Sequence, residues 1–372
     1  MSTSAITKPS DRRRIRARAP GKLILSGEHS VVYGAPALAV AVEHYTEVWF
    51  TPMHRSEGLR TAFDTLSQGA FYPFDALKSF KAGLDSRFDA FLRGELPVQK
   101  ILKRPDDLAI YTLTSLLPYL PVPGVTATRR LPAPGQLSSS SDLPLGAGMG
   151  SSAAVIAATF ALYEHLLEVP QSEDDRFKRV RFCERLQHGH GSAIDAASVV
   201  YGGVNRVQSD AAARVPLQLG DGWYWVLHGR PDASTGECVA HVRSRYGRDK
   251  ARWEAFADCT DTLQQVLEVG GDPSSAIREN HRLLSDIDVV PAPAERFVDA
   301  VEQCGGSAKI SGAGTIRGEY GGVVLIYMPD PEAMETLMRA YPDRRWAPLR
   351  VASQGAHLFM PSVSEPAAAA AE

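Results

Sequence analysis

The sequence predicts a protein of mixed α and β structure that forms two domains or one large unit with two lobes. Its 372 residues exceed what a single hydrophobic core usually holds. Short apolar runs typical of strands alternate with longer runs that have helical spacing. A stretch rich in Ser, Asp and Ala at 208–218 separates two such series. We expect a first lobe over 15–210, a second over 211–360, a flexible segment at 1–14 and a disordered tail at 361–372.

The first lobe contains both kinds of element. Strand patterns cover 15–19, 22–25, 43–51 and 199–204, and the stretch 37–42 is apolar with small side chains. The first two are separated by Pro20-Gly21, which predicts a break in the strand. Helical patterns cover 74–92, 151–167 and 174–187, the last with Ser172 and Asp174 as a start signal.

The second lobe shows the same alternation. Strand patterns cover 223–228, 322–327 and 349–352, and helical patterns cover 249–269, 274–284, 294–303 and 331–341. A second glycine-containing segment, Lys309-Ile310-Ser311-Gly312-Ala313-Gly314, lies between the helical pattern at 294–303 and the apolar strand at 322–327.

Composition excludes several classes of protein. A net charge of -3 argues against a general nucleic-acid-binding protein. The four cysteines form no C-x-x-C pair, so we expect neither disulfides nor a zinc site, and a reducing compartment. No apolar run approaches the ~18 residues of a membrane span, and no signal peptide is recognisable. We therefore expect a cytoplasmic location, with no nucleic-acid and no membrane partner.

The segment 143–154, Leu-Pro-Leu-Gly-Ala-Gly-Met-Gly-Ser-Ser-Ala-Ala, is the strongest local signal of function. Alternating glycines allow backbone N–H groups to turn toward an anion, and a helix start adds further unpaired N–H groups. Together they predict a phosphate-binding loop. The spacing matches neither the Walker loop nor the dinucleotide fingerprint. The alternative is a flexible turn before a buried helix.

Two other clusters contain residue types that carry chemistry. Lys22, Glu28 and His29 lie within eight positions, between strand patterns. Taken singly, each is more typical of a solvated surface or loop residue. His188 and His190 lack companion ligands at a zinc spacing, so we interpret His188 as a cation at a helix C-terminus.

Three separated pieces of the chain resemble one family. The run Pro20-Gly21-Lys22-Leu23-Ile24-Leu25-Ser26-Gly27-Glu28-His29-Ser30-Val31-Val32-Tyr33-Gly34 resembles the first motif of the GHMP kinases, and within them most that of the mevalonate kinases. The glycine segment at 144–154 resembles the ATP-binding motif of this family. The start of the third family motif resembles Ser311-Gly312-Ala313-Gly314. The resemblance implies an α+β fold of two lobes. The N-terminal α/β lobe would contain a left-handed β-α-β crossover, and the C-terminal lobe would be ferredoxin-like.

The resemblance also implies how nucleotide and metal are bound. ATP would contact Pro144, Gly146, Ala147, Gly148, Met149, Gly150, Ser151 and Ser152. Mg²⁺ would be held by Ser152 and Glu184, because Mg²⁺ prefers hard oxygen ligands and keeps several waters. Without the family, Glu184 would be interpreted as a solvated helix residue.

The expected reaction is transfer of the ATP γ-phosphoryl group to the 5-hydroxyl of mevalonate. Asp195 stands in an uncharged stretch, and we expect Lys22 to pair with it and keep it ionised. Asp195 would then accept or orient the hydroxyl proton. A purely structural ion pair is the alternative. The expected substrate contacts are Glu28, His29, Ser30, Tyr201, Gly312 and Ala313. His29 would donate to the acceptor, and Glu28 would position its hydroxyls or hold Lys22.

Two departures from the family pattern leave the acceptor open. The third motif continues with the bulkier segment 315–322, and His190 to Ala193 replaces an Asn-Pro-Ser-Gly segment. One alternative is a kinase for a phosphorylated mevalonate or a sugar, with Arg206 and Arg317 as extra cations. The other is a catalytically silent sensor that binds nucleotide or metabolite. The resemblance further implies a small-molecule substrate and a homodimer.

Overall fold

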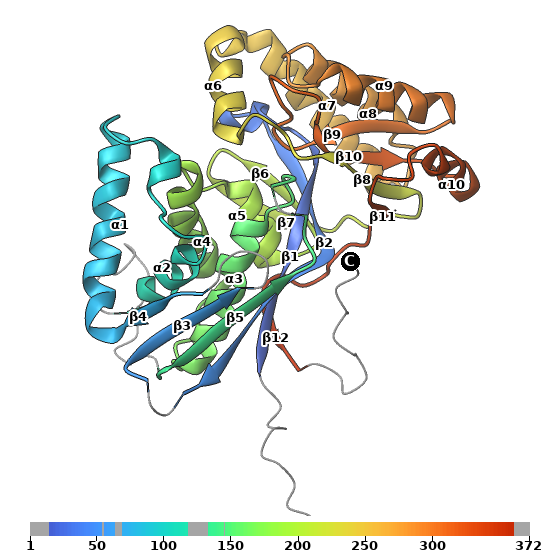
Figure 1. The fold of residues 1–372 in the computed structure, drawn as a ribbon. Coiled ribbons are helices and arrows are strands. Elements are labelled where there is room, and N and C mark those ends of the chain that lie inside the picture. The colour runs from blue at the N-terminus through green and yellow to red at the C-terminus, as the bar shows by residue number, and fades with distance from the viewer. Residues whose placement is uncertain (1–14, 54–55, 64–68, 118–132, 145, 361–372) are drawn as a thin grey trace, which may run out of the picture.

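A computed structural model describes residues 15–53, 56–63, 69–117, 133–144 and 146–360. The segments expected to be flexible or disordered, 1–14 and 361–372, lie outside the described residues. The described chain forms two lobes, each built on its own sheet (Figure 1). Within the described residues, no helix combines the length and apolar character needed to cross a membrane.

The first lobe contains an eight-stranded sheet in the order β12-β1-β2-β5-β3-β4, with β6 paired to β2 and β7 paired to β6. Its strands are β1 (Arg16–Ser26), β2 (Ala37–Pro52), β3 (Gly58–Phe63), β4 (Phe71–Pro73), β5 (Gly135–Ser141), β6 (Val204–Gln208), β7 (Ala211–Val215) and β12 (His357–Phe359). Neighbours β3 and β5 are parallel, and the chain passes between them through α1 (Leu77–Leu92) and α2 (Asp107–Ser115). This is the expected β-α-β crossover; its hand stays a prediction.

Strand β1 continues through Pro20-Gly21, so the predicted break there is wrong. The pairing with β2 shifts register between Pro20 and Gly21, which marks a bulge rather than a turn. A Cβ at Gly21 would overlap the Leu143 side chain, so the glycine lets segment 143–150 approach the strand. Directly after the bulge, the Lys22 N–H donates to the Met149 carbonyl over 3.0 Å. The bulge thus brings Lys22 next to the glycine segment.

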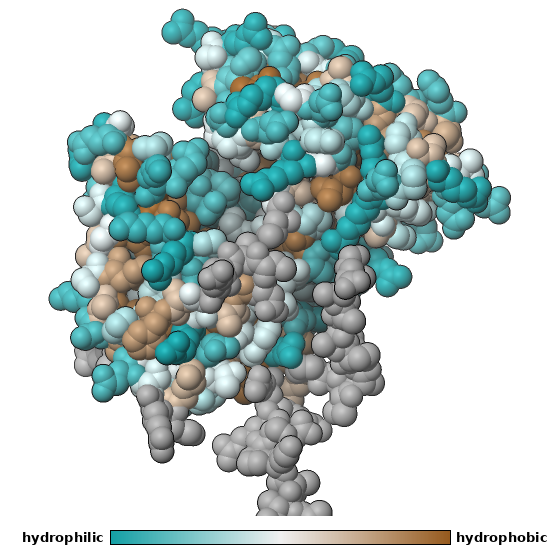
Figure 2. Space-filling view, in the orientation of Figure 1, coloured by the Kyte–Doolittle hydropathy of each residue, from teal (hydrophilic) through white to brown (hydrophobic). Residues whose placement is uncertain are grey.

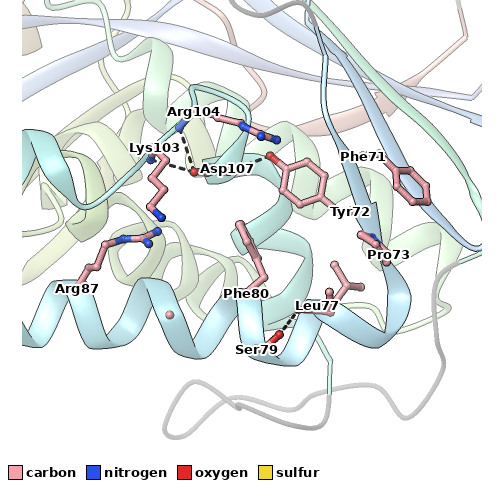
Figure 3. Close-up of a pocket in the computed structure, with 12 residues that line it drawn as sticks. Phe71, Tyr72, Pro73, Leu77, Ser79, Phe80, Arg87, Lys103, Arg104 and Asp107 are labelled. Atoms are coloured by element: carbon pink, nitrogen blue, oxygen red, sulfur yellow. Dashed lines mark hydrogen bonds between the residues drawn. The ribbon is translucent and has the colours of Figure 1, made fainter.

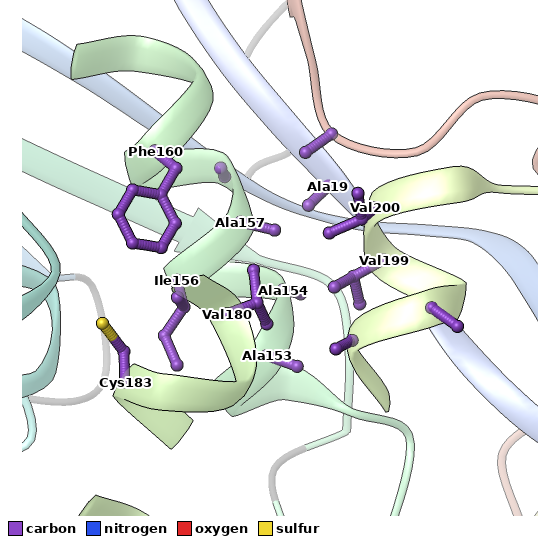
Figure 4. Close-up of a cluster of buried hydrophobic side chains, with 14 of the residues drawn as sticks. Ala19, Ala153, Ala154, Ile156, Ala157, Phe160, Val180, Cys183, Val199 and Val200 are labelled. Atoms are coloured by element: carbon purple, nitrogen blue, oxygen red, sulfur yellow. The ribbon is translucent and has the colours of Figure 1, made fainter. Parts of the chain in front are cut away.

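Helix α3 (Ser151–Leu166) packs on the sheet at the centre of the first lobe, beside α5 (Ala193–Tyr201), which also packs on the sheet. Helix α4 (Glu173–His188) covers both. The alanines of α3 allow close packing against β1 and α5, as Figure 4 shows. The strand expected at 199–204 is wrong, because helix α5 extends to Tyr201 and β6 begins at Val204. Val199 and Val200 are buried in this core, and tertiary packing there overrides their β propensity.

The second lobe contains an antiparallel sheet in the order β11-β8-β10-β9. Its strands are β8 (Trp223–Gly229), β9 (Ser307–Ser311), β10 (Gly322–Tyr327) and β11 (Trp346–Pro348). Its helices are α6 (Thr235–Tyr246), α7 (Lys250–Glu268), α8 (Ser274–Ser285), α9 (Ala292–Gln303) and α10 (Pro331–Arg339). This strand order, with helices after the first and third strands, is the expected ferredoxin-like arrangement. Helix α6 was not expected from the sequence.

The last part of the chain returns to the first sheet. The strand expected at 349–352 is reduced to one bridge between Val42 and Val351, and β12 then pairs with β1. Strand β7 pairs with β6, so the first sheet extends beyond residue 210, where we expected the lobe to end. We propose that the lobes divide within 216–222, between β7 and β8.

Candidate active site

Three glycines of the segment 143–150 adopt a conformation that other residues rarely take. The φ angles of Gly146, Gly148 and Gly150 are 72°, 86° and 75°, in the left-handed region. Helix α3 begins immediately afterwards at Ser151, with Gly150 as its N-cap. The first N–H groups of a helix lack intrahelical partners and carry partial positive charge. This arrangement suits a phosphate group.

An ion pair between distant parts of the chain lies against this loop. The Lys22 Nζ is 3.3 Å from the Asp195 Oδ1. A Cβ at Gly150 would lie 3.0 Å from the Lys22 Cγ and 3.2 Å from the Asp195 Oδ1. The side chain of Lys22 is 6% exposed and that of Asp195 is 19% exposed. The carboxylate is therefore partly open to solvent, beside a buried cation.

Helix α5 fixes the position of Asp195. The Ser192 Oγ caps this helix and accepts the Asp195 N–H over 3.2 Å. Asp195 thus lies in the first helical turn, where the helix dipole favours a negative charge.

Glu184 on α4 is buried beside this pair, not solvated. Its Oε2 accepts the Ser192 N–H over 3.1 Å, and its Oε1 accepts the Ser152 Oγ–H over 3.4 Å. Burial, followed by the nearby Asp195 carboxylate, raises the pKa of Glu184 well above its ordinary value. A cation between the two carboxylates would favour the ionised form of Glu184.

These oxygen donors fit the requirements of Mg²⁺. Glu184 and Ser152 offer hard oxygen ligands next to the phosphate-binding loop. The described residues contain no group of three His, Cys, Asp or Glu side chains that would hold a metal by themselves. Mg²⁺ at this position would therefore also need phosphate oxygens and water as ligands, which is its usual mode of binding beside nucleotides.

His29 differs from the expectation that it donates to the acceptor. Its ring Nε2 lies 3.0 Å from the Ala313 carbonyl oxygen, which only accepts, so Nε2 carries the hydrogen. Burial lowers the pKa of His29 to about 4, so the ring is neutral at pH 7. Its Nδ1 is then an acceptor, and it is buried without a partner among the described residues. Its φ of 61° is a strained value for a non-glycine residue, of the kind found at functional sites.

Glu28 pairs with Lys309 of β9, not with Lys22 as we considered. Both side chains are almost completely buried, 1% and 0% exposed. The Glu28 Oε1 accepts from the Lys309 Nζ and from the Gly312 N–H, the latter over 3.4 Å. Burial lowers the pKa of Lys309, and the Glu28 carboxylate opposes that effect. The Glu28 Oε2 is buried without a partner among the described residues.

Lys309 was missed as a site residue, because a single lysine at the start of the second glycine-containing segment gives no local signal, and its strand β9 was not predicted. Its role becomes visible only when the two lobes are packed together. The Ser311 Oγ, two residues further along β9, also bonds across the lobes, to the N–H and carbonyl of Ile24. The first and third motifs are thus joined directly.

The structure does not bring every expected residue to the site. The Ser30 Oγ donates to the Gly27 carbonyl over 3.2 Å and closes a turn. The Tyr201 OH donates to Asp174 over 3.2 Å. Asp174 precedes Glu184 by ten residues on α4, about 15 Å along the helix, so Tyr201 lies away from the ion pair and its placement in the substrate pocket is corrected. Gly312 and Ala313 do contact Glu28 and His29.

The segment 143–152 joins the site mainly through its backbone. Ala147 and Met149 have buried side chains that belong to the core, and Pro144 accepts the Ala147 N–H over 3.4 Å. Ser152 faces Glu184, while Leu145 lies outside the described residues.

The cations considered for a phosphorylated acceptor have partners elsewhere. Arg317 pairs with Glu237 over 2.8 Å, and Arg206 pairs with Asp261 over 2.7 Å. His188 is exposed and ends α4, as expected. Desolvation lowers its pKa, which opposes the expected cationic form, and its Nε2 lies 3.3 Å from the Ser152 Oγ.

Arg230 is a further cation that the sequence did not suggest. It follows β8 and is exposed, and its Nε would lie 3.0 Å from a Cβ at Gly146. No ion pair joins it to a carboxylate in the described part of the chain. Its guanidinium is therefore available to an anion bound on the glycine loop.

Comparison with known proteins gives a consistent result. Residues 122–203 match the family model for the GHMP kinases N terminal domain. The chain is 27% identical over 326 residues to the mevalonate kinase of Pyrococcus abyssi, covering 81% of this chain and 86% of that protein. It is 28% identical over 363 residues to the mevalonate kinase of Bos taurus, covering 87% and 88%.

Solved structures show the same fold. The mevalonate kinase of Methanococcus jannaschii matches with a TM-score of 0.73 at 18% identity, covering 92% of this chain and 99% of that one. Lactococcus lactis galactokinase, solved with galactose, matches with a TM-score of 0.66 at 12% identity, covering 93% and 95%. Streptococcus pneumoniae phosphomevalonate kinase matches with a TM-score of 0.63 at 16% identity, covering 91% and 100%.

Proposed function

Since the chain belongs to the GHMP kinases, which transfer phosphoryl groups from ATP to alcohols, we propose that its acceptor is the 5-hydroxyl of mevalonate. The observation that carries this proposal is the Lys22–Asp195 pair lying against the glycine loop. Phosphoryl transfer depends mainly on positioning and charge stabilisation, and this arrangement offers both at one point.

The nucleotide would place its phosphates on the segment 146–152. The turned backbone amides and the start of α3 would bind the anionic oxygens, with Arg230 covering the loop near Gly146. Ser152 and Glu184 would hold Mg²⁺, which neutralises phosphate charge when bound.

Asp195 would accept or orient the proton of the acceptor hydroxyl. Its carboxylate is partly exposed and lies in the first turn of α5, so a substrate hydroxyl could reach it. Lys22 holds this carboxylate and would also stabilise negative charge that develops on the transferring group.

The acceptor would be bound next to the first motif. The Glu28 Oε2 and the His29 Nδ1 are buried acceptors without partners among the described residues. Each fits a hydroxyl donor, so two adjacent acceptors suit a substrate with more than one hydroxyl. Among acceptors with several hydroxyls, the relatives named mevalonate kinase favour mevalonate. The partners of Arg206 and Arg317 disfavour an acceptor that already carries phosphate.

The proposal includes two further expectations. The first is a cytoplasmic location, where disulfides are rare. The four cysteines have free thiols, in agreement with this location: Cys183, Cys238, Cys259 and Cys304. A homodimer is expected from the family resemblance.

A coupled assay of ADP release tests the acceptor. Mevalonate, phosphomevalonate and galactose are supplied in turn with ATP and Mg²⁺. We expect turnover with mevalonate at a kcat/KM at least about a hundredfold above the other two. A preference for another acceptor would overturn the assignment, and no ADP with any acceptor would favour a nucleotide- or metabolite-binding sensor.

A further inference from the structure

A cavity of about 350 Å³ lies outside the active site, in the first lobe. Figure 3 shows it between β4, helix α1 and the segment 103–107. No residue of the Lys22–Asp195 site lines it. On α1 the lining residues run from Leu77 to Arg87, whereas Phe91, in the last turn of that helix, contacts Gly189 next to the active site. The cavity and the catalytic residues are therefore separate places on the lobe.

Most of the cavity wall is apolar. Phe71, Tyr72, Leu77 and Phe80 form this part, and Phe71 is 43% exposed. Figure 2 shows hydrophobic residues at the surface over the region where Figure 1 places α1 and β4. A Cβ at Gly83 of α1 would have no atom within 4 Å, so the absence of a side chain there leaves the hollow open. A flat apolar group would find contact area on this wall.

The polar part of the cavity is strongly positive. Arg87, Lys103 and Arg104 line it, and in Figure 3 the Arg87 and Lys103 side chains point toward one another. The Arg87 Nε donates to the Ile101 carbonyl over 2.6 Å, which holds the guanidinium in place. None of the three cations has an ion pair with a carboxylate within the described residues. An excess of positive charge on one wall favours binding of an anion.

The nearby carboxylates do not neutralise these cations. Asp107, the acidic residue of the wall, accepts the Tyr72 OH over 2.9 Å and the N–H groups of Lys103 and Arg104 over 3.0 Å each. Asp85 on α1 is bonded to Lys81 and Arg185 instead. The cavity wall thus carries three cations against one carboxylate, that of Asp107, and keeps an excess of positive charge.

We propose that this cavity binds a small organic anion, with a flat apolar body against the aromatic wall and a phosphate or carboxylate headgroup between Arg87, Lys103 and Arg104. The binding site is independent of the nucleotide and the acceptor. Its ligand is recognised by a combination of charge and apolar area, since Arg and Lys bind both kinds of headgroup.

Titration calorimetry tests the site with phenyl phosphate and benzoate as probes, in the presence of saturating Mg²⁺ and a non-hydrolysable ATP analogue. We expect one molecule of at least one probe to bind per chain, and the tighter probe identifies the headgroup. Phenol, which lacks a headgroup, should bind at least about tenfold more weakly, equivalent to about 1.4 kcal/mol.

Two variants address the two halves of the site. Gly83→Leu fills the hollow without changing charge and replaces a helix-interior glycine with a better helix former. Lys103→Gln/Arg104→Gln removes exposed charges only. Each should weaken probe binding at least about tenfold. The matched control, Arg248→Gln/Lys250→Gln, removes the same charge from exposed positions of the second lobe and should leave the affinity within about twofold.

Absence of binding by both probes up to about 10 mM would overturn the proposal. Binding that appears only when the titration is repeated without the ATP analogue, or that neither variant weakens, would overturn it as well. These results are independent of the acceptor assay, so the site and the kinase function can fail separately.

Discussion

Two lysine–carboxylate pairs connect distant parts of this chain, and they differ in their access to solvent. In the Lys22–Asp195 pair, 6% and 19% of the side chains are exposed, whereas in the Lys309–Glu28 pair the values are 0% and 1%. The first pair lies against the phosphate-binding loop, and the second joins the first lobe to the second. Position and exposure thus separate a pair suited to reacting with a substrate from a pair suited to holding the lobes.

The two pairs should also differ in the free energy of unfolding that is lost when one partner is removed. A buried pair stabilises little when it is complete, but loss of one partner leaves an unpaired buried charge. A partly exposed pair is less costly to break, because water solvates the remaining charge. Variants at the two pairs should therefore separate activity from stability.

The largest effect is expected at Asp195. Asp195→Ala removes the group that would orient the acceptor hydroxyl, so we expect kcat to fall at least about a thousandfold. Nucleotide affinity should stay within a few-fold, because the glycine loop is retained. Steady-state kinetics and calorimetric binding of an ATP analogue check the two parts, and a near-normal kcat would exclude the assigned role.

Variants of the Lys309–Glu28 pair should change mainly the stability of the protein. Lys309→Met leaves the Glu28 carboxylate buried without its cation, and we expect the free energy of unfolding to fall by about 3–5 kcal/mol. Glu28→Gln/Lys309→Met removes both charges and should recover part of the loss. Urea unfolding measures both variants. A double variant less stable than the single one would contradict this interpretation of the pair.

The pH dependence of stability gives a smaller effect. Burial lowers the pKa of His29 and of His228 to about 4, from an ordinary value of 6.5. The unfolded chain therefore binds more protons between pH 6.5 and 4, and the free energy of unfolding should decrease as the pH falls through that window. Each histidine contributes up to about 1.4 kcal/mol per pH unit.

His228→Asn isolates one contribution to this dependence. Urea unfolding between pH 6 and 4.5 should show that the free energy of unfolding depends less steeply on pH in the variant than in the unmodified protein. The difference in slope should be about the contribution of one histidine. Identical slopes would show that His228 does not titrate as its burial implies.

The smallest effect is expected at Arg230. Arg230→Gln removes the exposed cation near Gly146, and we expect the KM for ATP to rise about three- to tenfold with kcat little changed. Arg248→Gln, which removes an exposed cation that follows α6, is the matched control. Equal KM values for both variants would show that Arg230 does not contribute to nucleotide binding.

The sequence predicted those parts of the molecule whose signal is local. The glycine segment, the start of α3 at Ser151 and helices α7 to α10 of the second lobe follow from spacing and start signals along the chain. The Lys22–Asp195 contact was predicted from the chemistry of a buried carboxylate together with the family resemblance, and it is present in the structure.

Other features depend on tertiary packing and carry no local signal. Pro20-Gly21 is a bulge rather than a break because segment 143–150 packs on the glycine. Val199 and Val200 are helical because both are buried in the core of the first lobe. The pairing of Lys309 with Glu28 and the neutral state of His29 both result from burial between the lobes. Neither spacing nor composition reveals that burial.

The most direct test of the difference between the two pairs is to measure kcat and unfolding free energy for Lys22→Met. Because this pair is partly exposed and adjacent to the phosphate-binding loop, we predict that kcat falls at least about a thousandfold. The free energy of unfolding should change by only about 1 kcal/mol. A variant that keeps most of its kcat, or that loses stability as severely as Lys309→Met while its folded fraction stays active, would contradict the account.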